Sequence, residues 1–246
     1  MIKTSIILTV YDRPHQAVRM LRTLQGAISE EFEVILVNDH ETQNIELKDF
    51  CDTLGFVKYI HTGAQKGGKQ MWRVPGFALN IGFKHSIGSN IIIGNSEMIL
   101  PNPEVIREIV SHVEKGFQCS PPVWCISSRQ WLKSIYPFFL GFPRQAFEDI
   151  RGYDEDFIGY CFDDDDVAHR LATLVDFIEL SEEWKIHHEM DKGKTKGQDA
   201  FITSEMWVYN KSMFEARKPH PIRNVGRDWG VLEKEYVRNK LEDVAL

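Results

Sequence analysis

Long apolar stretches are missing from this sequence. Nowhere in its 246 residues does an apolar run approach the ~20 residues that a membrane-spanning helix requires. The amino-terminal MIKTSIILTV also lacks the cleavage pattern of a signal peptide. We therefore expect a protein without a transmembrane segment that works in the cytoplasm.

Cysteine and positive charge are scarce as well. The four cysteines show no CxxC spacing, which argues against a disulfide scaffold or a structural zinc site. The formal net charge is −7 at pH 7, so the chain as a whole does not offer the basic face of a general polyanion binder. The segment GAQKGGKQ at 63–70 lacks the GK[ST] ending of a phosphate-binding P-loop.

The first half of the chain alternates strand and helix patterns. Apolar β-branched runs at 4–10 and 32–37 predict strands, and between them Pro14 begins a segment whose apolar residues recur every three or four positions. A strand, a crossover helix and a second strand form a parallel βαβ unit. The same alternation continues with strands expected at 57–61 and 90–93, a helix from Pro75, and a helix from Pro103 with Asn102 as its N-cap. The pattern predicts an α/β fold with a mostly parallel central sheet flanked by helices.

Polar side chains follow the predicted strands. Ligands bind to open parallel sheets at the carboxyl ends of the strands, so the residues that come next are candidates for a binding site. Those residues are Tyr11, Asp12 and Arg13 after the first strand, Asp39 after the second, and Asn95, Ser96 and Glu97 after the strand at 90–93. The last three lie between a buried strand and a predicted helix, which is a rigid place for a ligand-binding carboxylate.

The segment Gly152 to Arg170, GYDEDFIGYCFDDDDVAHR, sets acidic side chains among aromatic residues and then enters a helical pattern. Carboxylates held against apolar side chains are often functional. One alternative is an exposed helix start, where the acidic run at 163–166 would favour the helix dipole. A second is a calcium loop, with acidic residues or glycine at the first, third, sixth and twelfth positions, Asp154, Asp156, Gly159 and Asp165; Ile158 at the fifth position argues against it.

Together these segments resemble the nucleotide-diphospho-sugar glycosyltransferases of the GT-A fold, especially the large inverting family 2. SIILTVYDRP, VILVND, ALNIGF and IIIGNSEMILP follow the order and approximate spacing of that family's landmarks. The resemblance implies a single Rossmann-like GT-A domain. It also implies a donor site in which Asp39 contacts the nucleobase and the other contacts come from Tyr11, Asp12, Arg13, Arg73, Asn80 and Asn95.

The acidic segment resembles the acceptor segment of galactosyltransferase-like GT-A enzymes, which reads roughly GYDExFxGWGxED. The resemblance implies that Asp164 is the general base of an inverting transfer and that Asp163, Tyr153 and Asp154 bind the acceptor. Like-charge repulsion from the neighbouring aspartates would raise the proton affinity of Asp164. The aromatic residues Trp131, Tyr136, Phe138 and Phe139 are interpreted mainly as core residues, and the alternative for a few of them is stacking on sugar rings.

A metal site follows from the same resemblance. In the family, the last carboxylate of a DxD motif holds a divalent metal on the donor diphosphate, and here the motif reads Asn95-Ser96-Glu97. His188 resembles the family's late histidine, so Glu97 and His188 are the expected ligands of Mn²⁺ or Mg²⁺, with manganese the better match for an imidazole ligand. If His187 and His188 lie on a strand, only one of them faces the metal.

The resemblance covers positions 5 to about 192 and sets the expected domain organisation. A GT-A domain at 1–190 divides into a donor-binding half at 1–100 and an acceptor and catalytic half at 101–190. A C-terminal extension at 191–246 packs on the same domain. Its basic segment ARKPHPIRNVGR, 216–227, either contacts a phosphate-bearing acceptor or forms a surface strap.

The predicted function is transfer of a sugar from a nucleotide-diphosphate donor, a UDP-sugar by preference, to an acceptor hydroxyl with inversion. The acceptor stays open among a saccharide, a protein, a lipid-linked glycan and a modified nucleic-acid base. One alternative is a sugar-nucleotide nucleotidyltransferase, although Tyr11 to Pro14 lacks the glycine-rich loop of that class. The other is a non-catalytic sugar-nucleotide or glycan-binding module, favoured by the neutral Asn95 and by Leu79, where many relatives carry Arg.

Overall fold

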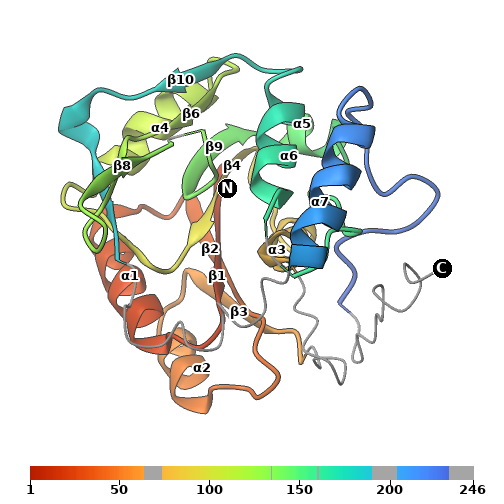
Figure 1. Cartoon of the computed structure of the whole chain (residues 1–246). Coiled ribbons are helices and arrows are strands. Elements are labelled where there is room, and N and C mark those ends of the chain that lie inside the picture. The colour runs from red at the N-terminus through yellow and green to blue at the C-terminus, as the bar shows by residue number, and fades with distance from the viewer. Residues whose placement is uncertain (64–73, 134, 160, 190–203, 233–246) are drawn as a thin grey trace.

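The computed structural model describes residues 1–63, 74–133, 135–159, 161–189 and 204–232, and it has the predicted α/β architecture (Figure 1). Within these residues the central sheet has seven strands in the order β10-β6-β9-β4-β1-β2-β3. Its strands are β1 (Thr4–Val10), β2 (Phe32–Asn38), β3 (Val57–His61), β4 (Asn90–Asn95), β6 (Gln118–Ser120), β9 (Phe139–Pro143) and β10 (Phe177–Glu179).

The core of the sheet is parallel. β1 pairs in parallel with β2 on one side and with β4 on the other, and β2 pairs in parallel with β3. β9 runs antiparallel to both β4 and β6. The carboxyl ends of β1, β2 and β4 therefore lie at one edge, where the register pairs Val10 with Asn38 and Thr9 with Asn95.

Helices cover both faces of the sheet because successive strand residues point to opposite sides. Ile6 and Leu8 face the layer formed by α1 (Pro14–Ala27), α2 (Ile45–Asp52) and α4 (Val105–Val113). Ile7 faces the layer formed by α3 (Pro75–Lys84), α5 (Arg144–Asp149) and α6 (Asp163–Leu171). At Gly82 in α3 a Cβ atom would lie 2.4 Å from Ile7 Cγ2, so glycine lets this helix approach the sheet closely.

A smaller sheet lies beside the central one and carries His188. It has the order β5-β11-β7-β8, and its strands are β5 (Met98–Ile99), β7 (Val123–Cys125), β8 (Gln130–Leu132) and β11 (Ile186–His188). The short 3-10 helix η1 (Glu182–Trp184) precedes β11. The described part of the C-terminal extension begins with α7 (Ser204–Arg217), which lies next to α6 in Figure 1. No helix in the described part of the chain is long and apolar enough to cross a membrane.

One local prediction was wrong. α4 begins at Val105 rather than at Pro103, because Asn102 Oδ1 accepts a 3.2 Å hydrogen bond from the backbone of Glu104 and forms a turn before the helix.

The four aromatic residues interpreted mainly as core differ in exposure. Phe139 is fully buried, whereas Trp131 is 46% exposed. It lies on β8, which is an edge strand of the described small sheet, and contacts Trp124 across the strand pair with 5.1 Å between ring centroids.

Candidate active site

The residues predicted to bind the donor lie at the carboxyl ends of the parallel strands. Tyr11 follows β1 and His40 lies just after β2, and their rings contact each other with 4.9 Å between centroids. Asp39 is fixed by its backbone N–H, which donates to Val10 O at 3.0 Å, and by Thr62, whose hydroxyl donates to Asp39 Oδ1 at 2.6 Å. An aromatic pair and a carboxylate are therefore held side by side at this edge.

Asn95 shapes the turn that presents Glu97. Its Oδ1 accepts a 3.1 Å hydrogen bond from the backbone N–H of Glu97, and the backbone N–H of Ser96 donates to Thr9 O at 3.1 Å. Asparagine caps such turns through its side-chain oxygen. The neutral residue at this position thus keeps the geometry of the turn while giving up one negative charge.

Glu97 joins two segments that are far apart in the sequence. One carboxylate oxygen forms an ion pair with the guanidinium of Arg13, and the other lies 3.0 Å from His188 Nε2. Arg13 is 7% exposed and belongs to the turn between β1 and α1, whereas His188 is the last residue of β11. Asp12 lies beside this group, with its Oδ1 3.7 Å from Arg13 Nε.

The contact between Glu97 and His188 agrees with a two-residue metal site. Two cis ligands of an octahedral ion, each at about 2.1 Å, are separated by about 3.0 Å, and His188 Nε2 and Glu97 Oε2 have that separation. The described residues contain no group of three or more His, Cys, Asp or Glu side chains placed to hold a metal. Glu97 and His188 would therefore suit an ion whose other positions are filled by the donor or by water, and the nearby Arg13 would weaken binding of the ion alone.

The acidic run begins at a strained point of the backbone. Cys161 and Phe162 both have positive φ, +77° and +72°, immediately before α6. Such conformations cost free energy in residues other than glycine and are common at functional sites. They turn the chain so that Asp163, at the start of α6, accepts a hydrogen bond from the backbone N–H of Gly76 near the start of α3.

Glycine is required at position 76. A Cβ atom on Gly76 would lie 2.1 Å from Cδ1 of Tyr153, so a larger residue would push the two segments apart. The start of α3 and the start of α6 meet here, and both supply backbone N–H groups to Asp163.

Asp163 and Asp164 have raised pKa values. For Asp163, burial raises the pKa to about 6, with a smaller contribution from the charge of Asp166, although backbone hydrogen bonds act in the opposite direction. For Asp164, burial and the charges of Asp163 and Asp165 raise the pKa well above the usual range of a carboxyl group. A base with a raised pKa holds a proton more strongly than an ordinary carboxylate.

The four aspartates have different partners. The hydroxyl of Tyr136 donates to Asp165 Oδ1 at 2.9 Å, and that of Tyr153 donates to Asp164 Oδ1 at a longer 3.4 Å. Asp166 is paired with arginine, as described below. Among the described side-chain contacts of the acidic run, the hydrogen bond to Asp164 is the longest, and Asp164 is partly exposed.

Two aromatic residues connect the acidic run with the cluster around Glu97. Tyr136 contacts Phe138 with 6.3 Å between ring centroids, and Phe138 contacts His188 with 5.3 Å. Since Tyr136 also binds Asp165, the two groups of polar residues are neighbours on either side of the segment before β9. Tyr136 and Phe138 are both partly buried, and their spacing in the sequence does not indicate the link that they form.

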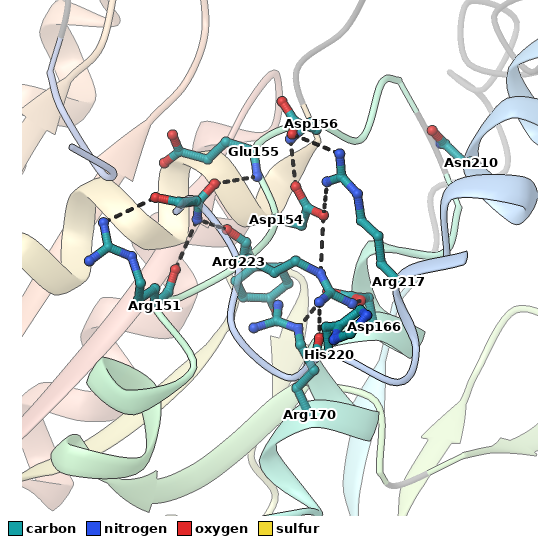
Figure 2. A network of polar contacts seen from close by, with 12 residues as sticks. Arg151, Asp154, Glu155, Asp156, Asp166, Arg170, Asn210, Arg217, His220 and Arg223 are labelled. Atoms are coloured by element: carbon teal, nitrogen blue, oxygen red, sulfur yellow. Dashed lines mark hydrogen bonds and ion pairs between the residues drawn. The ribbon is translucent and has the colours of Figure 1, made fainter. Parts of the chain in front are cut away.

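Three predicted ligand-binding residues have internal partners. Asn80 is fully buried in α3 and exchanges hydrogen bonds with the backbone of Tyr153, at 3.0 and 2.8 Å. Tyr153 is fully buried as well, and Asp154 is 1% exposed and paired with arginine (Figure 2). These contacts stabilise the segment between α5 and α6 that contains Tyr153 and Asp154. That Asn80, Tyr153 and Asp154 contact the donor or the acceptor stays a prediction. Arg73 lies outside the described residues.

The calcium-loop alternative is not supported by these contacts. Asp154 and Asp156, its first and third positions, both bind the guanidinium of Arg217.

Leu79 stands where many relatives of the resembled family carry Arg. It is 5% exposed and packs in the core between the sheet and the helices.

Sequence comparisons with known proteins give partial matches to glycosyltransferases. No protein-family model matches the chain. A protein of Rickettsia bellii named "uncharacterized glycosyltransferase" is 31% identical over 96 residues, which are 39% of this chain and 13% of that protein. A Rickettsia conorii protein with a similar name is 28% identical over 116 residues, 47% of this chain and 18% of that protein. The matched region is therefore less than a fifth of the length of either relative.

Solved structures are similar over most of the chain. Staphylococcus aureus TarS, residues 1–349 in complex with UDP-GlcNAc, has a TM-score of 0.70 and 14% identity, over 87% of this chain and 66% of that one. The mannosyltransferase PcManGT of Pyrobaculum calidifontis, in complex with GDP-Man and Mn²⁺, has a TM-score of 0.58 and 14% identity, over 88% and 62%. The chain has the GT-A-like α/β fold of these neighbours. The resemblance of its second half to galactosyltransferase-like enzymes stays a prediction.

Proposed function

We propose that this protein is a glycosyltransferase that moves a sugar from a nucleotide-diphosphate donor to an acceptor hydroxyl with inversion of the anomeric centre. The observation that carries the proposal is the placement of Asp164, a carboxylate of raised pKa, next to Asp165. Tyr136 binds Asp165, and Tyr136 and Phe138 connect it to the cluster of Arg13, Glu97 and His188. The names of the Rickettsia relatives and the nucleotide-sugar complexes of the structural neighbours support the same reaction class.

The donor is assigned to the edge formed by β1, β2 and β4. Asp39 and the ring of Tyr11 would hold the nucleobase, because both lie at strand ends where open α/β sheets bind nucleotides. Arg13 would lie against the diphosphate, since a buried guanidinium is suited to phosphate oxygens. We assign uridine as the base, as in the neighbour with bound UDP-GlcNAc.

Asp164 would take the proton of the acceptor hydroxyl. As the hydroxyl oxygen forms its bond to the anomeric carbon, the bond from that carbon to the diphosphate oxygen breaks, and the electron pair leaves with the nucleotide diphosphate. The proton ends on Asp164, and the product has the opposite anomeric configuration. Asp163 and Tyr153 would set the position of Asp164, the first through the start of α6 and the second through its hydroxyl.

Glu97 and His188 would hold a divalent cation, Mn²⁺ or Mg²⁺, together with oxygens of the donor. When bound, such an ion supplies positive charge that stabilises the leaving phosphate. The guanidinium of Arg13 is also positively charged, so the cation and Arg13 would both stabilise the negative charge of the leaving phosphate.

The test is hydrolysis of UDP-sugars by wild type and by two matched variants, Asp164→Asn and Asp165→Asn. Asparagine keeps the shape of the side chain and removes proton acceptance, so we expect the turnover of Asp164→Asn to fall by ~10²-fold or more. Nucleotide affinity, measured by calorimetry with UDP and with GDP, should stay unchanged. Asp165→Asn should keep most of the activity, because its amide oxygen can still accept from Tyr136.

Three results would contradict parts of this function. Nucleotide binding without any hydrolysis or transfer would indicate a non-catalytic binding module. Near-normal turnover of Asp164→Asn would move the base role to another carboxylate. A product that keeps the donor's anomeric configuration, measured by NMR, would exclude single displacement.

A further inference from the structure

The basic segment of the C-terminal extension is bound to the acidic segment within the same chain. Arg217 donates to Asp154 at 2.5 Å and to Asp156 at 3.0 Å (Figure 2). Arg227 also donates to Asp156, at 2.9 Å. Arg223 reaches deeper. Its Nε lies 3.2 Å from Asp154 Oδ2, and its Nη2 donates to Asp166 Oδ1 at 2.6 Å. These arginines are therefore engaged by carboxylates, which favours the strap over the phosphate-bearing acceptor.

The inner part of this network is a buried group of two arginines and two aspartates. Asp154, Asp166, Arg170 and Arg223 are each at most 3% exposed. Arg170 Nε donates to Asp166 Oδ2 at 2.7 Å and its Nη1 to Ile150 O at 3.0 Å. Two positive and two negative side chains balance one another, and removing one of them would leave a buried charge without its partner.

Arg223 is itself held in place by the backbone. Its N–H donates to Ile150 O at 3.2 Å, and its guanidinium donates to His220 O. Asn224, the next residue, has a φ of +52° and donates through Nδ2 to Arg151 O at 2.9 Å and to Tyr153 O at 2.8 Å. The side chain of Arg223 is thus a fixed bridge and not a flexible surface group.

The bridge spans the strained part of the acidic segment. Asp154 lies in the segment between α5 and α6, and Asp166 lies in the first turn of α6. Between these two residues are Cys161 and Phe162, both with positive φ. A strained backbone persists where surrounding contacts hold both of its ends. Arg223 is the described side chain that binds both ends at once.

We propose that Arg223 is a positioning residue for the transfer reaction: by bridging Asp154 and Asp166 it fixes the start of α6, which carries the proposed base. This role rests on the function proposed above. In this role, the C-terminal strap supports the reaction by holding the start of α6 in position, and none of its own groups reacts with donor or acceptor. A displacement of about 1 Å in a reacting group lowers turnover by as much as ~10²-fold, so the bridge has a measurable effect.

The same bridge affects the charge around Asp163. The groups that face Asp163 are the carboxylates of Asp164 and Asp166, the thiol of Cys161, the ring of Tyr153 and the backbone N–H of Gly76. The charge of Asp166 raises the pKa of Asp163, and Arg223 compensates that charge directly. Loss of the guanidinium should therefore move the titration of Asp163 to higher pH.

The experiment compares Arg223→Met and Arg223→Lys with Arg151→Met. Arg151 binds the same strap, through Asn224 O at 3.0 Å and Arg227 O at 2.7 Å, but those contacts involve no carboxylate. Arg151→Met therefore loosens the strap and leaves the bridge in place. For each variant we would measure kcat and KM for UDP-sugar hydrolysis, UDP affinity by calorimetry, and the melting temperature. The carboxyl titrations of Asp163 and Asp164 would be followed by ¹³C NMR.

We expect kcat of Arg223→Met to fall at least about tenfold, with KM and UDP affinity within twofold of wild type. Arg151→Met should lower the melting temperature and keep kcat. Lysine retains the charge but lacks the planar fork, so Arg223→Lys should have an intermediate kcat. If the methionine variant does not fold, the lysine variant decides: it lacks the planar fork that binds Asp154 and Asp166 together, and a wild-type kcat in Arg223→Lys would overturn the bridge.

The NMR titration separates this inference from the proposed function. If wild type hydrolyses no donor, the function fails, yet the bridge still predicts that Arg223→Met moves the titration of Asp163 to higher pH. A titration of Asp163 in Arg223→Met that matches wild type would overturn the inference whatever the activity. An equal loss of kcat in Arg151→Met would show that the strap has only a structural role.

Discussion

Replacing Asp163 by Asn should make the stability of this protein less dependent on pH. The pKa of Asp163 is raised from 3.8 to about 6, mainly by burial, so the folded state holds a proton more strongly than the unfolded state. Between these two pH values the folded chain is protonated at this site and the unfolded chain is not. The free energy of unfolding must therefore fall as the pH rises through this window.

The magnitude follows from the shift. A difference of about 2.2 pKa units corresponds to about 3 kcal/mol between the low-pH and high-pH limits. About 2 kcal/mol of this change falls between pH 4.5 and pH 7.5. Asp164 reinforces the effect, because removing the charge of Asp163 also lowers the pKa of Asp164.

The assay is urea unfolding of wild type and Asp163→Asn at pH 4.5 and pH 7.5. Other carboxyl groups titrate in both proteins, so the difference between the two free energies of unfolding isolates this site. We expect the difference, variant minus wild type, to increase by about 2 kcal/mol from the lower to the higher pH. A constant offset from altered hydrogen bonds to Gly76 N–H does not affect this comparison. A difference that is the same at both pH values would refute the reasoning.

Two other predictions concern the donor edge. Asp39→Ala should weaken UDP binding and leave the chain folded, because Asp39 lies at the end of a parallel strand, and unchanged affinity by calorimetry would show that the nucleobase binds elsewhere. Mn²⁺ binding without nucleotide should be weak and should strengthen when UDP is added, since Glu97 and His188 supply two ligands while Arg13 adds positive charge. Full hydrolytic activity after exhaustive chelation would remove the metal from the proposal.

The central fold could be predicted because its elements are long enough to show periodicity. The strand predicted at 4–10 has these bounds, and the helix predicted from Pro14 begins there. The small sheet could not be found in this way, because its strands have only two or three residues, too few to establish an alternation. Trp131 lies on an edge strand of the described part of this sheet, and an aromatic residue type alone does not show whether its side chain is buried.

The candidate site could be predicted only in part. Strand ends indicated Asp39 and Glu97, whereas His188, 91 residues after Glu97, was found through a family resemblance and not through a local pattern. The partners of Arg217 and Arg223 were left undecided for a physical reason. A basic segment shows that carboxylates or phosphates are needed nearby, but it does not show which acidic residues, some 60 positions away, will meet it.

The acidic run shows how four identical side chains acquire different properties. Successive residues of an α-helix point about 100° apart, so consecutive aspartates at a helix start must face different surroundings. The first meets backbone N–H groups at Gly76, the third a tyrosine hydroxyl, and the fourth two buried arginines. Mutual repulsion is thereby reduced where a partner is present. The second, Asp164, has only a long hydrogen bond, and its burial and the charges of Asp163 and Asp165 raise its pKa, so it binds a proton more strongly than an ordinary carboxylate does.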